Sequence, residues 1–256
     1  TTSDPMPIGL GAGLGIGGGR SATSSGAPSG GGAAPWSNTK SIHFDGTNEG
    51  ASLASTISVT GAFTISFWFK SPGTGDNIPS IITAENAGSG AQEDFIHLYT
   101  SAYPNYFKVV NYGSIQVGPN AWNDDTWYNV VYTRDGSDDT ELYVNGTSIG
   151  TSSYTGAILI SRFGIKNTTN DFYGNMDEIA FWDSALSDSD RHGIRGGASA
   201  GSLGAPADLD ELSATPTHWW RCGDGSDSGT TSYDVGSATA VNISLDNGAA
   251  FMSDVP

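Results

Sequence analysis

Carboxylates give the first test of chemistry, because hydrolysis of a glycosidic bond needs two of them. A retaining glycosidase holds two carboxyl groups about 5 to 5.5 Å apart, and a strand reading Glu-x-Asp-x-Glu or Glu-x-Asp-x-x-Glu can supply both. The sequence has neither pattern, because no glutamate is followed two positions later by aspartate. We therefore expect no enzymatic activity. A hydrolase with unfamiliar acids would have to use Asp177, Glu178 and Glu93.

Aromatic side chains in expected loops are the next candidates, because exposed rings can stack on sugars while Asn, Asp and Gln bind the hydroxyl groups. The candidates for carbohydrate binding are Tyr99, Tyr103, Tyr106, Tyr112, Trp122 and Tyr154. Five other tryptophans lie in strand-like runs, so we expect them in the core: Trp68, Trp127, Trp182, Trp219 and Trp220.

The sequence has no pattern typical of a serine-based triad, a disulfide, a zinc site or a phosphate loop. The four histidines are widely separated, and no Gly-x-Ser-x-Gly elbow is present. Cys222 is the single cysteine, so neither an intrachain disulfide nor a cysteine-based zinc site is expected. The run GLGIGGG lacks the Lys-Ser/Thr ending of a phosphate loop and is interpreted as part of an extended arm.

The charge of the chain restricts its partners. Twenty-seven acidic residues against 10 basic ones give a formal net charge of −17, which would repel a phosphate backbone, so we expect no nucleic acid partner. An acidic surface stays soluble in salt and offers carboxylates to divalent cations.

No segment approaches the roughly 20 apolar residues that span a bilayer, so no membrane insertion is expected. The N-terminus lacks signal-peptide features, so any export is expected to use another route, such as release by lysis inside a particle.

Short apolar or alternating runs, separated by turn-forming residues, indicate an all-β fold. Asp-Gly at 135–136 predicts a hairpin between the two runs that flank it. Asn-Gly at 145–146 predicts a second tight turn, and Gly174 permits a bulge in the strand that contains it. Strands are expected at 62–70, 126–134, 140–146, 147–150, 172–183, 217–225 and 240–245.

A single short surface helix is expected after the long strand. Ser187 can cap its N-terminus, with Asp188 and Asp190 in the first turn, and the segment runs to Arg195 before two glycines end it.

Residues 1–38 form a Gly/Ser/Ala/Pro-rich arm that cannot bury enough apolar area to offset its own ordering entropy. Fully extended, the arm could reach about 120 Å at roughly 3.3 Å per residue. We expect it to thread over neighbouring subunits of a large assembly; the alternative is that it lies on its own domain. The expected apolar anchors of this arm are Ile8, Leu10, Leu14 and Ile16.

Residues 39–256 are expected to form one domain, and four of its segments carry a family resemblance. In chain order they are SIHFDGTNEGASL, FTISFWFK, WYNVVYTRDGSDDTELYVNGTSIG and FYGNMDEIAFWDSALS, which lie within 41–195. Their order and spacing resemble laminin G-like domains of the concanavalin A-like lectin/glucanase superfamily. The resemblance implies a jelly-roll β-sandwich of two antiparallel sheets, completed by C-terminal strands within 215–252.

The same resemblance implies a calcium site. Asp45, Asp177 and Glu178 occupy positions that in relatives approach a structural Ca²⁺, which takes six to eight oxygen ligands. The alternative is that Asp45 closes a turn and Asp177 accepts amide hydrogen bonds without metal. Two other acidic groups lack EF-hand spacing and are interpreted as turn residues in solvent: Asp135 with Asp138 and Asp139, and Asp224 with Asp227.

The end of the chain suggests where the domain works. Residues 196–256, with HWWRCGDG and the ending AFMSDVP, resemble the continuation of laminin G-like proteins of marine bacteriophages. We therefore expect a non-catalytic virion structural protein, a capsid-decoration or fibre component that contacts copies of itself and neighbouring virion proteins through its arm. Its outward domain could touch host surface glycans. The alternative is a secreted or cell-surface carbohydrate-binding adhesin module of a marine bacterium, with the arm as a linker.

Overall fold

The computed structural model describes residues 36–73, 80–85, 92–99, 106–109, 115–117, 122–165 and 171–256. Trp36–Pro256 forms one compact unit. The expected arm anchors lie outside the described residues, as do Tyr103 and Tyr112.

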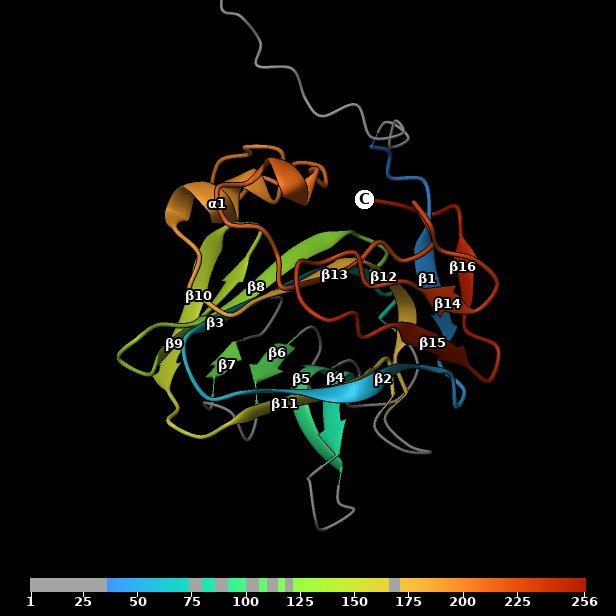
Figure 1. Ribbon diagram of the computed structural model, residues 1–256, viewed down its shortest axis with the longest axis horizontal. Coiled ribbons are helices and arrows are strands. Elements are labelled where there is room, and N and C mark those ends of the chain that lie inside the picture. The colour runs from blue at the N-terminus through green and yellow to red at the C-terminus, as the bar shows by residue number, and fades with distance from the viewer. Residues whose placement is uncertain are drawn as a thin grey trace, which may run out of the picture. The chain divides into compact units, whose positions relative to one another are not determined.

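Two antiparallel sheets build the domain (Figure 1). In spatial order the first contains β10 (Thr147–Ser153), β9 (Asp139–Val144), β8 (Tyr128–Arg134), β3 (Phe63–Lys70), β12 (Tyr173–Trp182), β1 (Ser41–Asp45) and β16 (Ala250–Met252), with β13 (His218–Trp220) also paired to β12. The second contains β14 (Thr231–Ser232), β15 (Ile243–Asp246), β2 (Gly50–Val59), β11 (Ile158–Phe163), β4 (Ser80–Glu85), β5 (Gln92–Tyr99), β6 (Tyr106–Val109) and β7 (Ile115–Val117). The predicted all-β jelly-roll sandwich is confirmed.

The main core lies between the two sheets. Alternate residues of β3 face it because side chains of a strand point to opposite faces in turn; these residues are Phe63, Ile65, Phe67 and Phe69, all fully buried. The second sheet contributes Ile57, Ile82, Ile96, Phe107 and Phe163 to the same cluster. Burial of such apolar area is the main favourable term in folding.

The hairpin signals were correct. β8 pairs antiparallel with β9, from Val130 opposite Val144 to Arg134 opposite Thr140, and β9 pairs with β10 across the Asn145-Gly146 turn. The run at 217–225 forms only the short strand β13, because the chain turns at Cys222, whose φ is 53°.

The bulge of β12 was placed wrongly. Its register against β3 shifts between Asp177 and Ala180, where Glu178 has a φ of 43°, rather than at Gly174. Gly174 is needed for a close approach instead, because a Cβ there would lie 2.0 Å from the carbonyl oxygen of Lys70.

A second, smaller cluster covers part of the outer face of the first sheet. Helix α1 (Asp188–Gly193) begins as predicted, with the Ser187 hydroxyl accepting from the Asp190 amide at 3.2 Å. The 3₁₀ turn η1 (Leu209–Glu211) follows it. The cluster joins outward residues of the sheet to these segments: Val131, Tyr143, Ala180, Trp182, Leu186, Ile194, Leu209 and Trp219. Across the described ranges, no helix is long and apolar enough to cross a bilayer.

Candidate functional site

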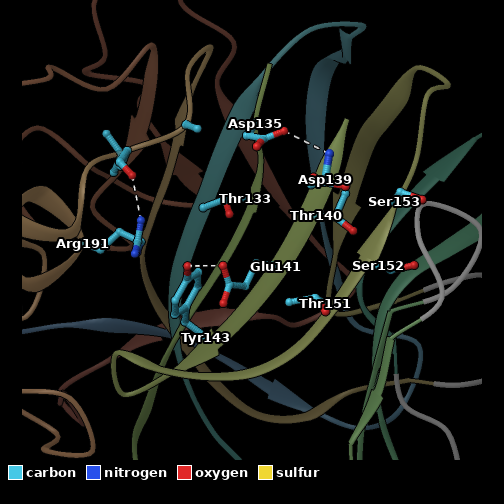
Figure 2. Close-up of a pocket in the computed structure, with 12 residues that line it drawn as sticks. Thr133, Asp135, Asp139, Thr140, Glu141, Tyr143, Thr151, Ser152, Ser153 and Arg191 are labelled. Carbon is cyan, nitrogen blue, oxygen red and sulfur yellow. Dashed lines mark hydrogen bonds between the residues drawn. The ribbon is translucent and has the colours of Figure 1, made fainter. Parts of the chain in front are cut away.

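A polar groove of about 810 Å³ opens on the outer face of the first sheet, where the smaller cluster ends (Figure 2). Strands β8, β9 and β10 form its floor, and residues before and within α1 form one side. The residues that line it are Thr133, Asp135, Asp139, Thr140, Glu141, Tyr143, Thr151, Ser152, Ser153, Ala185, Leu186 and Arg191.

The register of the three strands aligns the polar side chains in rows. Glu141 of β9 pairs with Thr133 of β8 and with Thr151 of β10, so the three residues lie side by side. Asp139 pairs in the same way with Ser153 of β10. Because side chains repeat on one face every second residue, both rows face the groove.

Glu141 is the central acceptor of the groove. Its Oε2 atom accepts from the Tyr143 hydroxyl at 2.5 Å, and its Oε1 atom accepts from the Ser148 hydroxyl. A carboxylate has about four lone-pair sites, so these two bonds leave room for two more donors. The arrangement suits a ligand with neighbouring hydroxyl groups.

Arg191 covers Tyr143 on the helix side of the groove. Its guanidinium carbon lies 4.3 Å from the centre of the Tyr143 ring, and Nη1 donates to the Leu186 carbonyl at 2.8 Å. Nη2 forms an ion pair with Asp188. Burial and the hydrogen bond to Glu141 raise the pKa of Tyr143 above its ordinary value, so its hydroxyl remains a donor at neutral pH.

Trp122 and Tyr154, the candidates for sugar stacking whose side chains the structure describes, do not line the groove. Trp122 is 1% exposed, with its ring 6.1 Å from that of Phe69, so the prediction of an exposed loop aromatic was wrong there. Tyr99 and Tyr106 lie opposite each other in β5 and β6, in strands rather than loops. Tyr154 is half-buried, and its hydroxyl donates to the Ala157 carbonyl at 3.3 Å.

The expected calcium ligands do not form one set. Asp45 pairs with Tyr173, which precedes Asp177 by four residues on β12. Because strands rise about 3.3 Å per residue, Asp45 lies well away from Asp177 along the sheet. Asp45 closes a turn instead, accepting from the Thr47 amide at 2.8 Å. Among the described residues, no group of three or more His, Cys, Asp or Glu side chains could hold a metal ion. Asp45 therefore does not join Asp177 and Glu178 in one set of side-chain ligands.

Asp177 and Glu178 belong to a buried carboxylate cluster with Asp224. At the bulge, Asp177 contacts the segment before β1, while Glu178 contacts β13 and the residue that follows it. The side chain of Asp177 accepts from the Asn38 amide group at 3.0 Å and from the Glu178 backbone amide at 2.8 Å. Glu178 accepts from the Trp219 indole at 2.6 Å and from Arg221 Nε at 3.1 Å.

Asp224 also binds the segment before β1. It is 7% exposed rather than in solvent, because it accepts from the backbone amides of Thr39 and Lys40 at 2.6 and 3.1 Å. Arg221 adds a bond to the Ser37 carbonyl at 2.5 Å. The sequence placed residues 36–38 in the arm, but the structure shows Ser37 and Asn38 bonded to the sandwich. The cluster therefore acts as a clasp on residues 36–40.

Burial sets the protonation of this cluster. Desolvation, followed by the nearby Glu178 charge, raises the pKa of Asp177 well above its usual value. Desolvation also raises the pKa of Glu178 to about 7, although Arg221 and Trp219 lower it.

The groove was not predicted from the sequence, although β9 carries a signal for it. In DTELYV, Thr140, Leu142 and Val144 are buried on one face, whereas exposed Asp139, half-buried Glu141 and Tyr143, which is buried in the smaller cluster, lie on the other. This alternation shows which residues leave the core, but the partners from β8, β10 and α1 come from the register and the packing.

Comparisons with known proteins agree with this fold. The family model described as Laminin_G_3, concanavalin A-like lectin/glucanases superfamily, matches residues 45–190. Among curated proteins, none matches this chain. A putative carbohydrate binding protein from Bacteroides ovatus is 17% identical with a TM-score of 0.59, and the match covers 86% of this chain and 61% of that one. The chain thus spans less than two thirds of that protein's length.

Two further structures are more distant. The native heptameric SAP-like pentraxin from Limulus polyphemus is 15% identical, with a TM-score of 0.48 and coverage of 81% of this chain and 95% of that one. The CBM40 of the Ruminococcus gnavus IT-sialidase, bound to alpha2,3 sialyllactose, is 17% identical, with a TM-score of 0.44 and coverage of 60% and 96%.

Proposed function

Because this chain belongs to the laminin G-like family of the concanavalin A-like lectin/glucanase superfamily, we propose that its sandwich is a non-catalytic glycan-binding domain. The ligand lies in the groove over β8, β9 and β10. One observation carries the proposal: Thr133, Glu141 and Thr151 form a continuous polar row on the outer face of the sheet (Figure 2).

The row supports binding of a polyhydroxylated ligand in particular. Hydroxyl side chains both donate and accept, and a carboxylate accepts from several donors, which matches the alternating donor and acceptor character of sugar hydroxyls. The Bacteroides ovatus protein that shares the fold is itself described as a putative carbohydrate binding protein, which adds support.

Burial supports a non-catalytic role. Asp177 and Glu178, two of the three acids that an unfamiliar hydrolase would have to use, are 0% and 3% exposed. Their oxygens already accept bonds from protein donors. A general acid must reach the leaving-group oxygen of its substrate, and these side chains are covered. The third acid, Glu93, lies in β5, and its side chain is outside the described residues.

The experiment that tests the proposal is binding of the intact protein to a printed array of neutral, amino-bearing and anionic oligosaccharides. We expect reproducible binding to a subset, with no release of reducing ends from the bound glycan over a day. The absence of binding to every glycan on the array would contradict the proposed function.

We further propose that the domain is displayed on a virion as a capsid-decoration or fibre component. The glycine-rich composition of residues 1–38, the net charge of −17 and the phage-like C-terminal segment support it. Mass spectrometry and antibody labelling of purified particles test this step. Detection only at a bacterial cell surface would favour the adhesin instead, and the groove proposal would stand.

A further inference from the structure

The groove contains three carboxylates and one guanidinium. Asp135, Asp139 and Glu141 line it together with Arg191, while the other lining side chains are uncharged. Asp188, beside the groove, adds a fourth negative charge through its pair with Arg191. The charge that a ligand meets is therefore negative.

The one cation among the described lining residues is already engaged by the protein. The side chain of Arg191 is only 15% exposed. Both terminal nitrogens have partners, Leu186 and Asp188, and the planar face rests on Tyr143. An anionic sugar would meet a guanidinium whose charge is already paired with Asp188, and it would lose hydration on entering the groove.

The groove also has no exposed stacking platform among its lining residues. Among the described residues, Tyr143 is the only aromatic one there, and it is 9% exposed beneath Arg191. Without a large ring to stack on, the ligand must be held by hydrogen bonds to hydroxyl groups and carboxylates. The strongest of these are donated to charged acceptors, which favours ligands rich in hydroxyl or amino donors.

We propose, on the basis of the proposed function, that the groove binds glycans without anionic groups, with sugar hydroxyls donating to Glu141 and Asp139. It excludes sialylated, uronate and sulfated glycans by repulsion from its carboxylates. The groove also binds amino sugars, because a protonated amino group is a cation that the carboxylates of Glu141 and Asp139 attract.

The test uses pairs of ligands in which one member carries an anionic group and the other does not. The glycan array is read first, and affinities are then measured by titration calorimetry at low salt. The pairs are oligogalacturonate with its methyl ester, lactose with sialyllactose, and the best neutral ligand with its singly carboxylated derivative. We expect the added anion to weaken binding at least tenfold, which corresponds to about 1.4 kcal/mol, and this ratio to shrink as salt screens the charges.

A variant locates the effect in the groove. Asp139 is exposed, so Asp139→Asn should leave folding unchanged while it reduces the discrimination between neutral and anionic ligands at least threefold. Asp183→Asn, an exposed residue that is not among the lining residues, is the matched control and should leave the ratio unchanged.

The outcomes separate this inference from the proposed function. If binding is confined to anionic glycans, or if both members of the charged pairs bind equally, the inference is wrong while glycan binding stands. If no glycan binds, both are wrong.

Discussion

The guanidinium carbon of Arg191 lies 4.3 Å from the centre of the Tyr143 ring, which joins helix α1 to strand β9 at the side of the groove. Arg191 also pairs with Asp188 and bonds the Leu186 carbonyl. The helix is only six residues long, so this side chain is one of its main attachments to the sheet.

Replacing Arg191 with alanine should loosen this side of the groove. We expect a loss of about 1 to 2 kcal/mol in the free energy of unfolding, because a partly desolvated cation–π contact is worth about that much. Glycan affinity should fall several-fold as Tyr143 becomes mobile. Arg191→Lys keeps the charge but not the planar contact, so it should recover only part of both losses. Denaturant unfolding and calorimetry provide the measurements, and an unchanged Arg191→Ala variant would contradict the role given to this residue.

The buried ring of Trp122 leads to a different prediction. Trp122→Ala should destabilise the domain by about 3 to 5 kcal/mol, the usual cost of removing a large buried aromatic side chain. Its folded fraction should bind glycans with unchanged affinity. Tyr154→Phe, which removes only a hydroxyl, serves as a mild control. If Trp122→Ala had normal stability but had lost glycan binding, Trp122 would be a glycan-binding residue and not a core residue.

The fold was largely predictable because its signals are local. Apolar and polar residues alternate along β3 and β9, and Asp-Gly and Asn-Gly form the turns. Both signals depend only on neighbouring residues, so the sequence indicates the hairpins directly. The bulge at Glu178 was not predictable, because a non-glycine residue with positive φ is held there by partners more than 40 positions away, Trp219 and Arg221.

The groove was less predictable, for the same physical reason. Glu141 could be recognised as an outward residue, but the neighbours Thr133 and Thr151 depend on register, and Arg191 depends on where α1 packs. Trp122 shows the converse: a residue outside the strands can be fully buried when it packs against a core ring such as Phe69.

The buried carboxylate cluster predicts a pH dependence. Glu178 has a pKa of about 7 in the folded protein, raised from 4.5, so the folded state binds this proton more tightly than the unfolded state. The resulting stabilisation is complete below pH 4.5 and is lost as the pH rises through about 7. A change of one pKa unit is worth about 1.4 kcal/mol.

Glu178→Gln should therefore flatten the decline of unfolding free energy between pH 4.5 and 7, relative to the natural chain. Glu211→Gln, at an exposed site, should leave the decline as it is. Urea unfolding at several pH values measures both. A Glu178→Gln curve parallel to that of the natural chain would show that Glu178 does not titrate in this range.

The clasp on residues 36–40 predicts the effect of two truncations. A chain that begins at Trp36 keeps every bond to the carboxylate cluster, so its midpoint of thermal unfolding should be close to that of the full chain. A chain that begins at Ser41 leaves Asp177 and Asp224 without the donors of Asn38 and Thr39. Each unsatisfied buried group costs about 1 to 3 kcal/mol, so its midpoint should fall by at least about 4 °C. A large loss already at Trp36 would favour the alternative that the arm lies on its own domain.

The most direct test of the central claim is the affinity of the best array glycan for Glu141→Ala, measured by titration calorimetry beside Glu211→Ala. Removing the Glu141 carboxylate deletes the acceptor at the middle of the polar row, so we expect at least a tenfold loss of affinity, about 1.4 kcal/mol, with the fold intact by circular dichroism. Glu211→Ala should bind as the natural chain does. Equal affinities for the two variants would place the ligand outside the groove and contradict the account.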